Sequence, residues 1–210
     1  NALVGHGVSV VTLCYMRRYL RFLQELLAAE QGTAELSAEV ATWLSDTASA
    51  LRRIRPWLGQ GPVSAGQRWQ ALEKLGVAAS RYRQSVYADT PFAGKVRHPL
   101  AQVHEFLGNA LVAIDHSIRT NRREDGMYHA YNVLDFGAGE ARVDRLYLML
   151  EGQVAALSSG ALEPGEAAAL VESLFSSGLY RPDQRSFMLY PDLQLPRCLE
   201  QNRIHKAGIR

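Results

Sequence analysis

Apolar residues recur at intervals of three and four along most of the chain, which is the spacing of one face of an α-helix. Glycine, proline and capping residues stand at the ends of these periodic runs. We therefore predict six helices, over residues 8–31, 33–55, 65–87, 99–118, 142–158 and 164–177.

Local signals support several of these boundaries. Ser64 and Gln67 form a capping-box pattern at the start of the third helix, and Pro99 suits the first turn of the fourth. Gly76 lies in the middle of the third helix, where glycine costs about 1 kcal/mol relative to alanine. We interpret this glycine as a position where another helix approaches closely.

No stretch alternates between apolar and polar residues for long enough to predict a sheet. The expected fold class is therefore all-α: an antiparallel helix bundle or a partial α/α toroid of about six helices. The segment after Leu179 is expected to be irregular because Pro182, Pro191 and Pro196 interrupt it, with an extended piece at 187–190 and a brief helix at 197–202.

The chain is expected to form a single helical domain over residues 1–210. It starts with Asn1 instead of methionine, so we expect it to be a fragment of a longer polypeptide. Its two cysteines, Cys14 and Cys198, lie far apart and form no disulfide framework, which favours a reducing, cytoplasmic location. The longest apolar run, 8–13, is too short to span a bilayer, so no membrane association is expected.

The segment from Arg119 to Asp135 is the densest polar stretch, and we call it the polar stretch. Glu124 and Asp125 are candidates for a catalytic acid or base, and a helix would place Asp125 and His129 on one face. If the segment is a loop, its side chains can converge on a cavity. The candidate ligand-binding residues here, which offer hydrogen bonds and ring stacking to a polyhydroxylated ligand, are Arg123, Tyr128, His129, Tyr131 and Asn132.

A second polar segment, 180–185, has the sequence YRPDQR, and we call it the downstream loop. It is a candidate for the opposite wall of the same site. Glu151, in the fifth predicted helix, and Asp183 are the candidates for an opposing carboxylate. The candidate binding residues of this wall are Tyr180, Gln184 and Arg185. Both polar segments have a structural alternative, in which their charges pair locally and their tyrosines pack in the interior.

Other kinds of site receive little support. The histidines form no pair at helical spacing, so no metal ligand set and no cofactor are expected. The glycines of the sequence FGAGE, Phe136 to Glu140, follow no convincing strand and do not meet a phosphate-loop fingerprint. We interpret Gly137 and Gly139 as a simple turn of the chain.

Three strings within 121–204 resemble a portion of large bacterial proteins grouped with cellobiose-phosphorylase-like enzymes. They are DGMYHAYN (125–132), MLEGQVAALSSG (149–160) and YRPDQRSFMLYPDLQLPRCLEQN (180–202). The resemblance implies a helical toroid-like architecture, a sugar as ligand and a chain that is part of a larger protein. The three tryptophans all precede this region, so the resemblance implies a ligand class and not a reaction.

Three hypotheses follow. The first is a carbohydrate-active helical domain of hydrolase or phosphorylase type, with an oligosaccharide, with or without phosphate, as partner. The second is a non-catalytic helical interaction or scaffold domain. The third is a bundle that binds a polyanion through arginine clusters, although a net charge of +2 argues against a nucleic acid partner.

Overall fold

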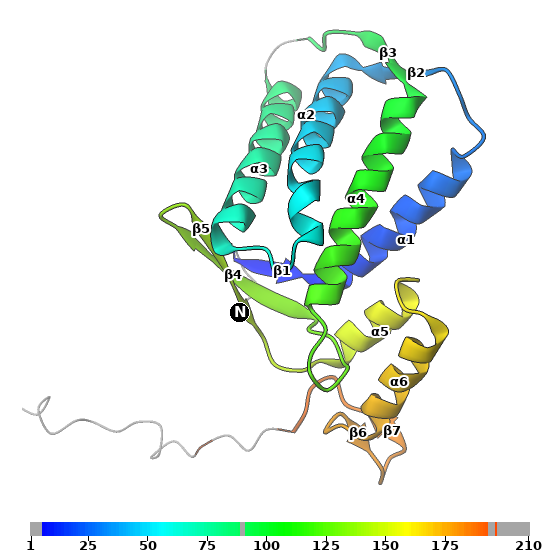
Figure 1. The fold of residues 1–210 in the computed structure, drawn as a ribbon, viewed down its shortest axis with the longest axis vertical. Helices are drawn as coiled ribbons and strands as arrows, with labels where there is room; N and C mark the ends of the chain where they lie inside the picture. Colours follow the sequence, from blue (N-terminus) through cyan, green and yellow to red (C-terminus); the bar gives the residue numbers. More distant parts are fainter. Residues whose placement is uncertain (1–5, 89–90, 193–195, 197–210) are drawn as a thin grey trace, which may run out of the picture.

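The computed structural model describes residues 6–88, 91–192 and 196. Its largest part is a layer of four long helices that lie side by side in the order α3, α2, α4, α1 (Figure 1). Helix α1 is therefore at one edge of the layer and α3 at the other. The four helices are α1 (Val10–Leu26), α2 (Ala38–Ile54), α3 (Ala65–Tyr87) and α4 (Leu100–Thr120).

A two-stranded antiparallel ribbon closes one end of the layer (Figure 1). Its strands are β2 (Thr33–Ser37) and β3 (Lys95–Pro99), which come from distant parts of the chain. Strand β2 continues directly into α2, and β3 continues directly into α4. The strands are antiparallel, so the two helices leave opposite ends of the ribbon, yet both begin at it and extend toward the other end of the layer (Figure 1).

A three-stranded antiparallel sheet with the order β1-β4-β5 crosses the other end of the layer. Its strands are β1 (Gly7–Ser9), β4 (Tyr131–Gly137) and β5 (Glu140–Arg145). Ala138 and Gly139 form the two-residue loop between β4 and β5, and both have positive φ, of 52° and 79°. Positive φ at both loop residues is the geometry of a type I′ hairpin turn.

A smaller helical part lies beside the N-terminal half of α1 (Figure 1). It contains α5 (Leu150–Ser158), α6 (Pro164–Phe175) and a short hairpin of β6 (Tyr180–Arg181) and β7 (Ser186–Phe187). Buried Arg17 of α1 joins the two parts. Its guanidinium forms an ion pair with Asp115 of α4 and donates to the carbonyl oxygen of Ser159, 3.0 Å away, at the end of α5.

Serine residues define where three of the long helices begin. The side chains of Ser9, Ser37 and Ser64 each accept a hydrogen bond from the backbone N–H three residues later. These bonds satisfy one of the amides that a helix leaves without a partner in its first turn. The Gln67 side-chain oxygen also accepts a hydrogen bond from the Ser64 amide, so the predicted capping box is confirmed.

The main hydrophobic core lies where the four-helix layer meets the smaller part. It contains residues of α1, α4, α5 and α6 and, between them, two residues of the polar stretch, Met127 and Tyr128. Tyr128 is only 3% exposed. A second, smaller cluster joins α2 and α4 through Leu51, Ile54 and Ala110. The polar stretch is therefore part of the interior as well as of the surface.

The prediction of an all-α fold was wrong, and with it the helix bundle and the α/α toroid. The chain has mixed α and β structure, with seven strands in three antiparallel sheets within the described residues. These strands are two to seven residues long, and β1–β4 and β2–β3 pair across large sequence separations. Such pairing leaves no periodic signal within a local window of sequence.

Several helix boundaries change for the same reason. Residues 33–37 form a strand before α2, and residues 142–145 belong to β5, so the fifth helix is only the second half of the predicted one. The predictions for 65–87 and for a helix opening at Pro164 are confirmed. The extended piece is residues 186–187, shorter and earlier than predicted. The predicted helix at 197–202 lies outside the described residues.

Two glycines differ in what surrounds them. A Cβ atom added at Gly76 of α3 would meet no other atom within 4 Å, so the interpretation of close helix contact there was wrong. A Cβ added at Gly152 of α5 would lie 3.0 Å from backbone atoms of Ala130 and from the Tyr128 carbonyl oxygen. Helix α5 thus packs directly on the backbone of the polar stretch, and only glycine permits this distance.

We predict opposite effects of alanine at these two glycines. Gly152→Ala should lower the free energy of unfolding by about 2 kcal/mol or more, because the new methyl group meets backbone that cannot move aside. Gly76→Ala should raise it by up to about 1 kcal/mol, because alanine is the better helix former at an open position. Urea unfolding of both variants measures this, and equal effects would contradict the packing of α5.

Candidate functional site

The polar stretch begins as the last turn of α4 and folds into a tight turn before β4. The Arg123 amide donates to the Met127 carbonyl oxygen at 2.7 Å, and the residues on either side, Arg122 and Tyr128, form a single β-bridge. Gly126 has a φ of 80°, which permits the reversal. The prediction of a loop is therefore right for 121–130, whereas the residues from Tyr131 onward are a strand.

The side chain of Gln153 of α5 binds the backbone of this turn. Its side chain is fully buried, with 0% exposure. Its Oε1 accepts from the Tyr128 amide at 2.8 Å, and its Nε2 donates to the carbonyl oxygens of Tyr128 at 2.7 Å and Met149 at 2.8 Å. The amide side chain therefore completes both backbone hydrogen bonds of Tyr128, in the way a neighbouring strand does in a sheet.

Asp125 lies on the outer side of the turn and pairs with its own neighbour. Both carboxylate oxygens accept from the Arg123 guanidinium, at 2.9–3.1 Å, and Oδ1 also accepts from the Met127 amide at 3.1 Å. Burial opposes ionisation here, but these hydrogen bonds outweigh it and hold the pKa of Asp125 below its usual value. Asp125 is therefore ionised at neutral pH and has no proton to donate.

His129 and Asn132 point into the structure. The Nδ1 atom of His129 lies 3.0 Å from the Leu146 carbonyl oxygen, and burial lowers the pKa of this buried imidazole below its usual value of 6.5. Asn132 donates through Nδ2 to Oδ1 of Asn121 at 2.8 Å. Nδ1 of His129 and Nδ2 of Asn132 thus connect the turn to neighbouring protein groups, whereas the buried Oδ1 of Asn132 has no hydrogen-bond partner among the described residues.

Tyr131 and Glu151 are the two candidates that meet across elements, one on β4 and one in the first turn of α5. The nearby Glu151 carboxylate favours the protonated phenol and, with burial, raises the pKa of Tyr131 to about 12. Glu124 is exposed at the tip of the turn.

The downstream loop forms a second, separate turn between β6 and β7. Asp183 is exposed and binds the Arg181 guanidinium through both oxygens, at 3.0 and 2.9 Å, and this hydrogen bonding lowers the pKa of Asp183. Tyr180 packs edge-on against Phe175, with ring centroids 5.0 Å apart. Gln184 and Arg185 are exposed, and Arg185 has a positive φ of 47°, which fits a tight turn.

A hollow of about 320 Å³ lies beside the polar stretch. Of the four candidate acids, which all belong to the described residues, only Asp125 lines it. Three of the other six lining residues bear hydroxyl groups. The six are Met127 of the polar stretch, Leu148 before α5, Ser173 of α6, and Ser176, Ser177 and Gly178 of the turn after α6. Cleavage of a glycosidic bond by two carboxyl groups needs both acids at one cavity, about 5 or 6.5–9.5 Å apart. This hollow has only one carboxyl group in its lining, that of Asp125.

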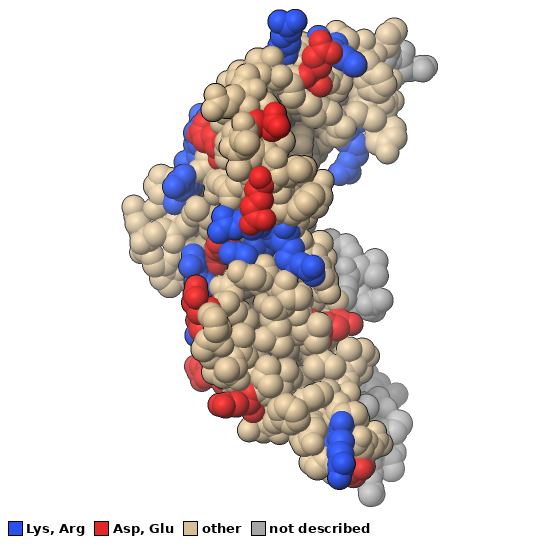
Figure 2. All heavy atoms as spheres, turned by 90° about the vertical axis from the view of Figure 1, so that its right-hand side faces the viewer, with Lys and Arg blue, Asp and Glu red and all other residues tan. Residues whose placement is uncertain are grey.

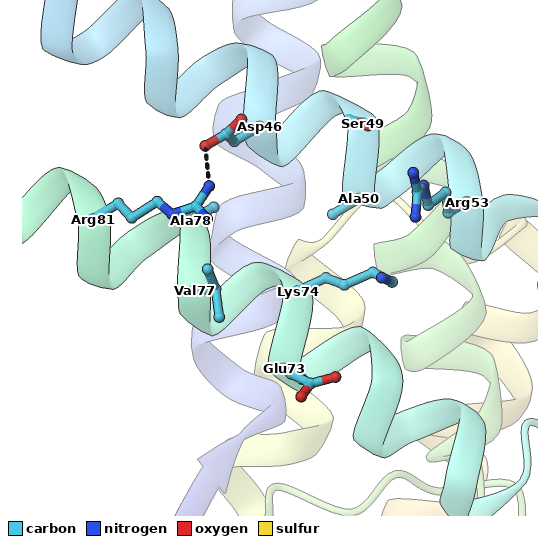
Figure 3. Close-up of a pocket in the computed structure, with 9 residues that line it drawn as sticks. All are labelled: Asp46, Ser49, Ala50, Arg53, Glu73, Lys74, Val77, Ala78 and Arg81. Atoms are coloured by element: carbon cyan, nitrogen blue, oxygen red, sulfur yellow. Dashed lines mark ion pairs between the residues drawn. The ribbon is translucent and has the colours of Figure 1, made fainter.

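A second hollow, of about 300 Å³, lies between α2 and α3 (Figure 3). Figure 3 shows Asp46 and Arg81 paired across it, at 3.5 Å, with Arg53, Lys74 and Glu73 along its length. Acidic and basic groups alternate here, so the hollow presents no field of one sign. None of the predicted site residues lines it.

The sequence contains four arginine clusters, which lie on α1, at the end of α2, on α3 and at the end of α4. They are Arg17/Arg18/Arg21, Arg52/Arg53/Arg55, Arg81/Arg83 and Arg119/Arg122/Arg123. Each contains at least one residue that pairs with an acid: Arg17 with Asp115, Arg52 with Glu105, Arg81 with Asp46, and Arg122 with Glu166. Figure 2 shows Asp and Glu interspersed with Lys and Arg on one face of the molecule. Lys and Arg side chains gather near the middle of this face, and in each cluster an acid offsets the charge of at least one arginine.

Two kinds of feature are absent from the described residues. No group of three or more His, Cys, Asp and Glu side chains there could hold a metal ion. Among the same residues, no helix has the length and apolar character needed to cross a membrane.

Sequence reasoning missed three features of this region. Arg17 and Gln153 lie in segments that were predicted as ordinary helices. The structure shows that both side chains are buried and bound to backbone groups of other segments. A polar residue within the mostly apolar 149–157 run was the available signal for Gln153. The serines of 173–177 carried no signal, because they meet Asp125 only through the packing of α6.

No protein-family model matches this chain, and no curated protein matches it. The resemblance to cellobiose-phosphorylase-like proteins therefore stays a prediction.

We predict that removing the Gln153 side-chain amide destabilises the fold strongly. Gln153→Ala leaves the amide and carbonyl of Tyr128 buried without partners, and each such loss costs about 1–3 kcal/mol. The free energy of unfolding should fall by about 3 kcal/mol. Gln184→Ala, at an exposed position, should change it by less than about 0.5 kcal/mol. Urea unfolding compares the two, and equal effects would contradict the role assigned to Gln153.

We predict that stability falls on mild acidification because of His129. Its pKa is lower in the folded than in the unfolded chain, so the unfolded chain binds more protons once the pH drops below about 6.5. The stability that depends on neutral His129 is fully present above about pH 6.5. It is lost as the pH falls from there through the lower pKa of the folded state. Melting temperatures at pH 7.5 and 5.5 measure this.

The variant His129→Asn should reduce the difference between the two melting temperatures, whereas His116→Asn on α4 should leave it unchanged. An equal pH dependence in wild type and His129→Asn would contradict this assignment.

Proposed function

We propose that this chain is a non-catalytic helical interaction domain, in which the polar stretch serves to join its two parts. The observation that carries the proposal is the set of hydrogen bonds between Gln153 and the backbone of Tyr128. They make the polar stretch a structural connection between α4, β4 and α5, with Met127 and Tyr128 in the main core.

The state of the candidate acids supports this proposal. Asp125 and Asp183 are each bound by an arginine two residues away in the same turn, and both have lowered pKa values. A general acid for glycoside cleavage needs a raised pKa so that it carries a proton at neutral pH. Glu151 is engaged with Tyr131. These groups therefore act as fixed anions that order two turns.

A sugar ligand is the second candidate function, and one observation favours it. The hollow beside the polar stretch combines the Asp125 carboxylate with the side chains of Ser173, Ser176 and Ser177. Carboxylate and hydroxyl groups of this kind hydrogen-bond to sugar hydroxyls. In this alternative the chain binds a saccharide as one part of a larger polypeptide, and any cleavage depends on groups outside it.

A thermal-shift screen against a panel of oligosaccharides, with and without phosphate, distinguishes the two candidates. The interaction-domain proposal predicts no change in melting temperature with any sugar. A rise in melting temperature would overturn it if the rise is lost in Asp125→Asn and Ser176→Val, which alter the hollow. Asp144→Asn, at an exposed position of β5, is the matched control for the change of charge.

A further inference from the structure

Helix α1 has an apolar surface on its outer side as well as on its inner side. Its inner side, with Val10, Cys14 and Arg17, faces the core. Its outer side carries five large apolar residues that are about half exposed: Tyr15 48%, Met16 47%, Tyr19 60%, Phe22 56% and Leu26 59%. A helix that is apolar on both sides is typical of a helix covered on both sides. Single exposed apolar residues are ordinary, but a continuous row of this size marks an interaction surface.

The spacing of this row is that of a coiled-coil seam. Tyr15, Tyr19, Phe22 and Leu26 are separated by four, three and four residues, which is the alternation of a and d positions in a heptad. We call these four residues the α1 seam. Helix α1 lies at the edge of the four-helix layer, so the seam is not enclosed between neighbouring helices (Figure 1). The seam therefore has the form of one half of a helix pair.

The charges beside the seam indicate what the other half is. Arg18 and Glu25, seven residues apart, flank one side, and both are exposed. Met16 and Leu23 flank the other side. If two α1 helices pair antiparallel, with Tyr19 opposite Phe22 of the second copy, Tyr15 lies opposite its Leu26. Residues in equivalent flanking positions then face each other across an antiparallel pair.

In that register Arg18 faces Glu25 of the second copy, and by symmetry Glu25 faces its Arg18. On the other side Met16 faces Leu23 of the second copy. One side of the seam therefore pairs residues of opposite charge, and the other side pairs apolar residues. A parallel pair would instead set Arg18 beside Leu23 of the second copy. The seam is thus complementary to itself only when the helices are antiparallel, which is the arrangement around a two-fold axis.

We propose that the α1 seam is a self-association surface, through which two copies of this chain form an antiparallel α1–α1 dimer. The inference rests on the proposed interaction role and gives it a partner, a second copy of the same chain. The seam extends about 16 Å along the helix. Its short length makes a reversible dimer, with a concentration-dependent population, the expected form.

Charge exchange at Arg18 and Glu25 tests the surface and the orientation together. The molar mass of the 210-residue chain is measured by sedimentation equilibrium over about 1 μM to 1 mM, a range that covers weak dimers. The wild-type chain should change from monomer to dimer within this concentration range. Arg18→Glu and Glu25→Arg should each weaken the dimer about tenfold or more, because each turns two attractive pairs into repulsive ones.

The double variant Arg18→Glu/Glu25→Arg should restore dimerisation to near the wild-type level, because it rebuilds both pairs with the signs exchanged. Arg83→Glu, on α3 at the opposite edge of the layer, makes the same charge change as Arg18→Glu and should have no effect. All of these positions are exposed, and circular dichroism verifies that each variant is folded.

Three results would overturn the proposal: a wild-type monomer at every concentration, a dimer that ignores the single exchanges, or a double variant that is not rescued. None of these bears on whether the polar stretch is structural. Conversely, a sugar-induced thermal shift lost in Asp125→Asn would overturn the proposed function whatever the molar mass. The two failures are therefore separate observations.

Discussion

The position of the polar stretch depends on the buried side chain of Gln153. An amide in the interior is costly unless its donors and acceptor are satisfied. Gln153 meets this condition with three backbone bonds, two of them to a single residue, Tyr128. Because Tyr128 lies in the main core and Gly152 brings α5 onto the same backbone, the turn, α5 and the core are joined through this one short segment.

This constraint explains the composition of the polar stretch. Arginine, aspartate, asparagine and histidine occur close together there because a turn that enters the core must satisfy its backbone and its charges locally. Asp125 accepts from Arg123 and from the Met127 amide, and Asn132 binds Asn121. The density of functional groups in a sequence therefore does not distinguish a binding site from a buried connection, since both need closely spaced hydrogen bonds.

Features set by local sequence were predictable, and those set by distant pairing were not. The span 65–87 was correct because its capping box and periodicity act within a few residues, and the same holds for the helix that opens at Pro164. The strands at 33–37 and 95–99 are defined by each other, and neither has enough alternation to be recognised alone. At the candidate site, composition singled out the polar stretch, but it did not show that Asp125 pairs with Arg123 of the same turn. The direction of a side chain depends on tertiary packing, which cannot be inferred from the spacing of residues in the sequence.

The pairing of β1 with β4 has a consequence for how the chain acquires its structure. Strand β1 lies at residues 7–9, yet its partner residues are 131–133. Ribosomes add roughly 5–20 residues per second, so β1 stays without its partner for on the order of ten seconds during synthesis. During that interval α1 can form, but its capping serine Ser9 is held only by the local turn and its outer apolar seam is already exposed. The order of synthesis thus leaves the row of exposed apolar residues on α1 in place before the sheet that pairs with β1 exists.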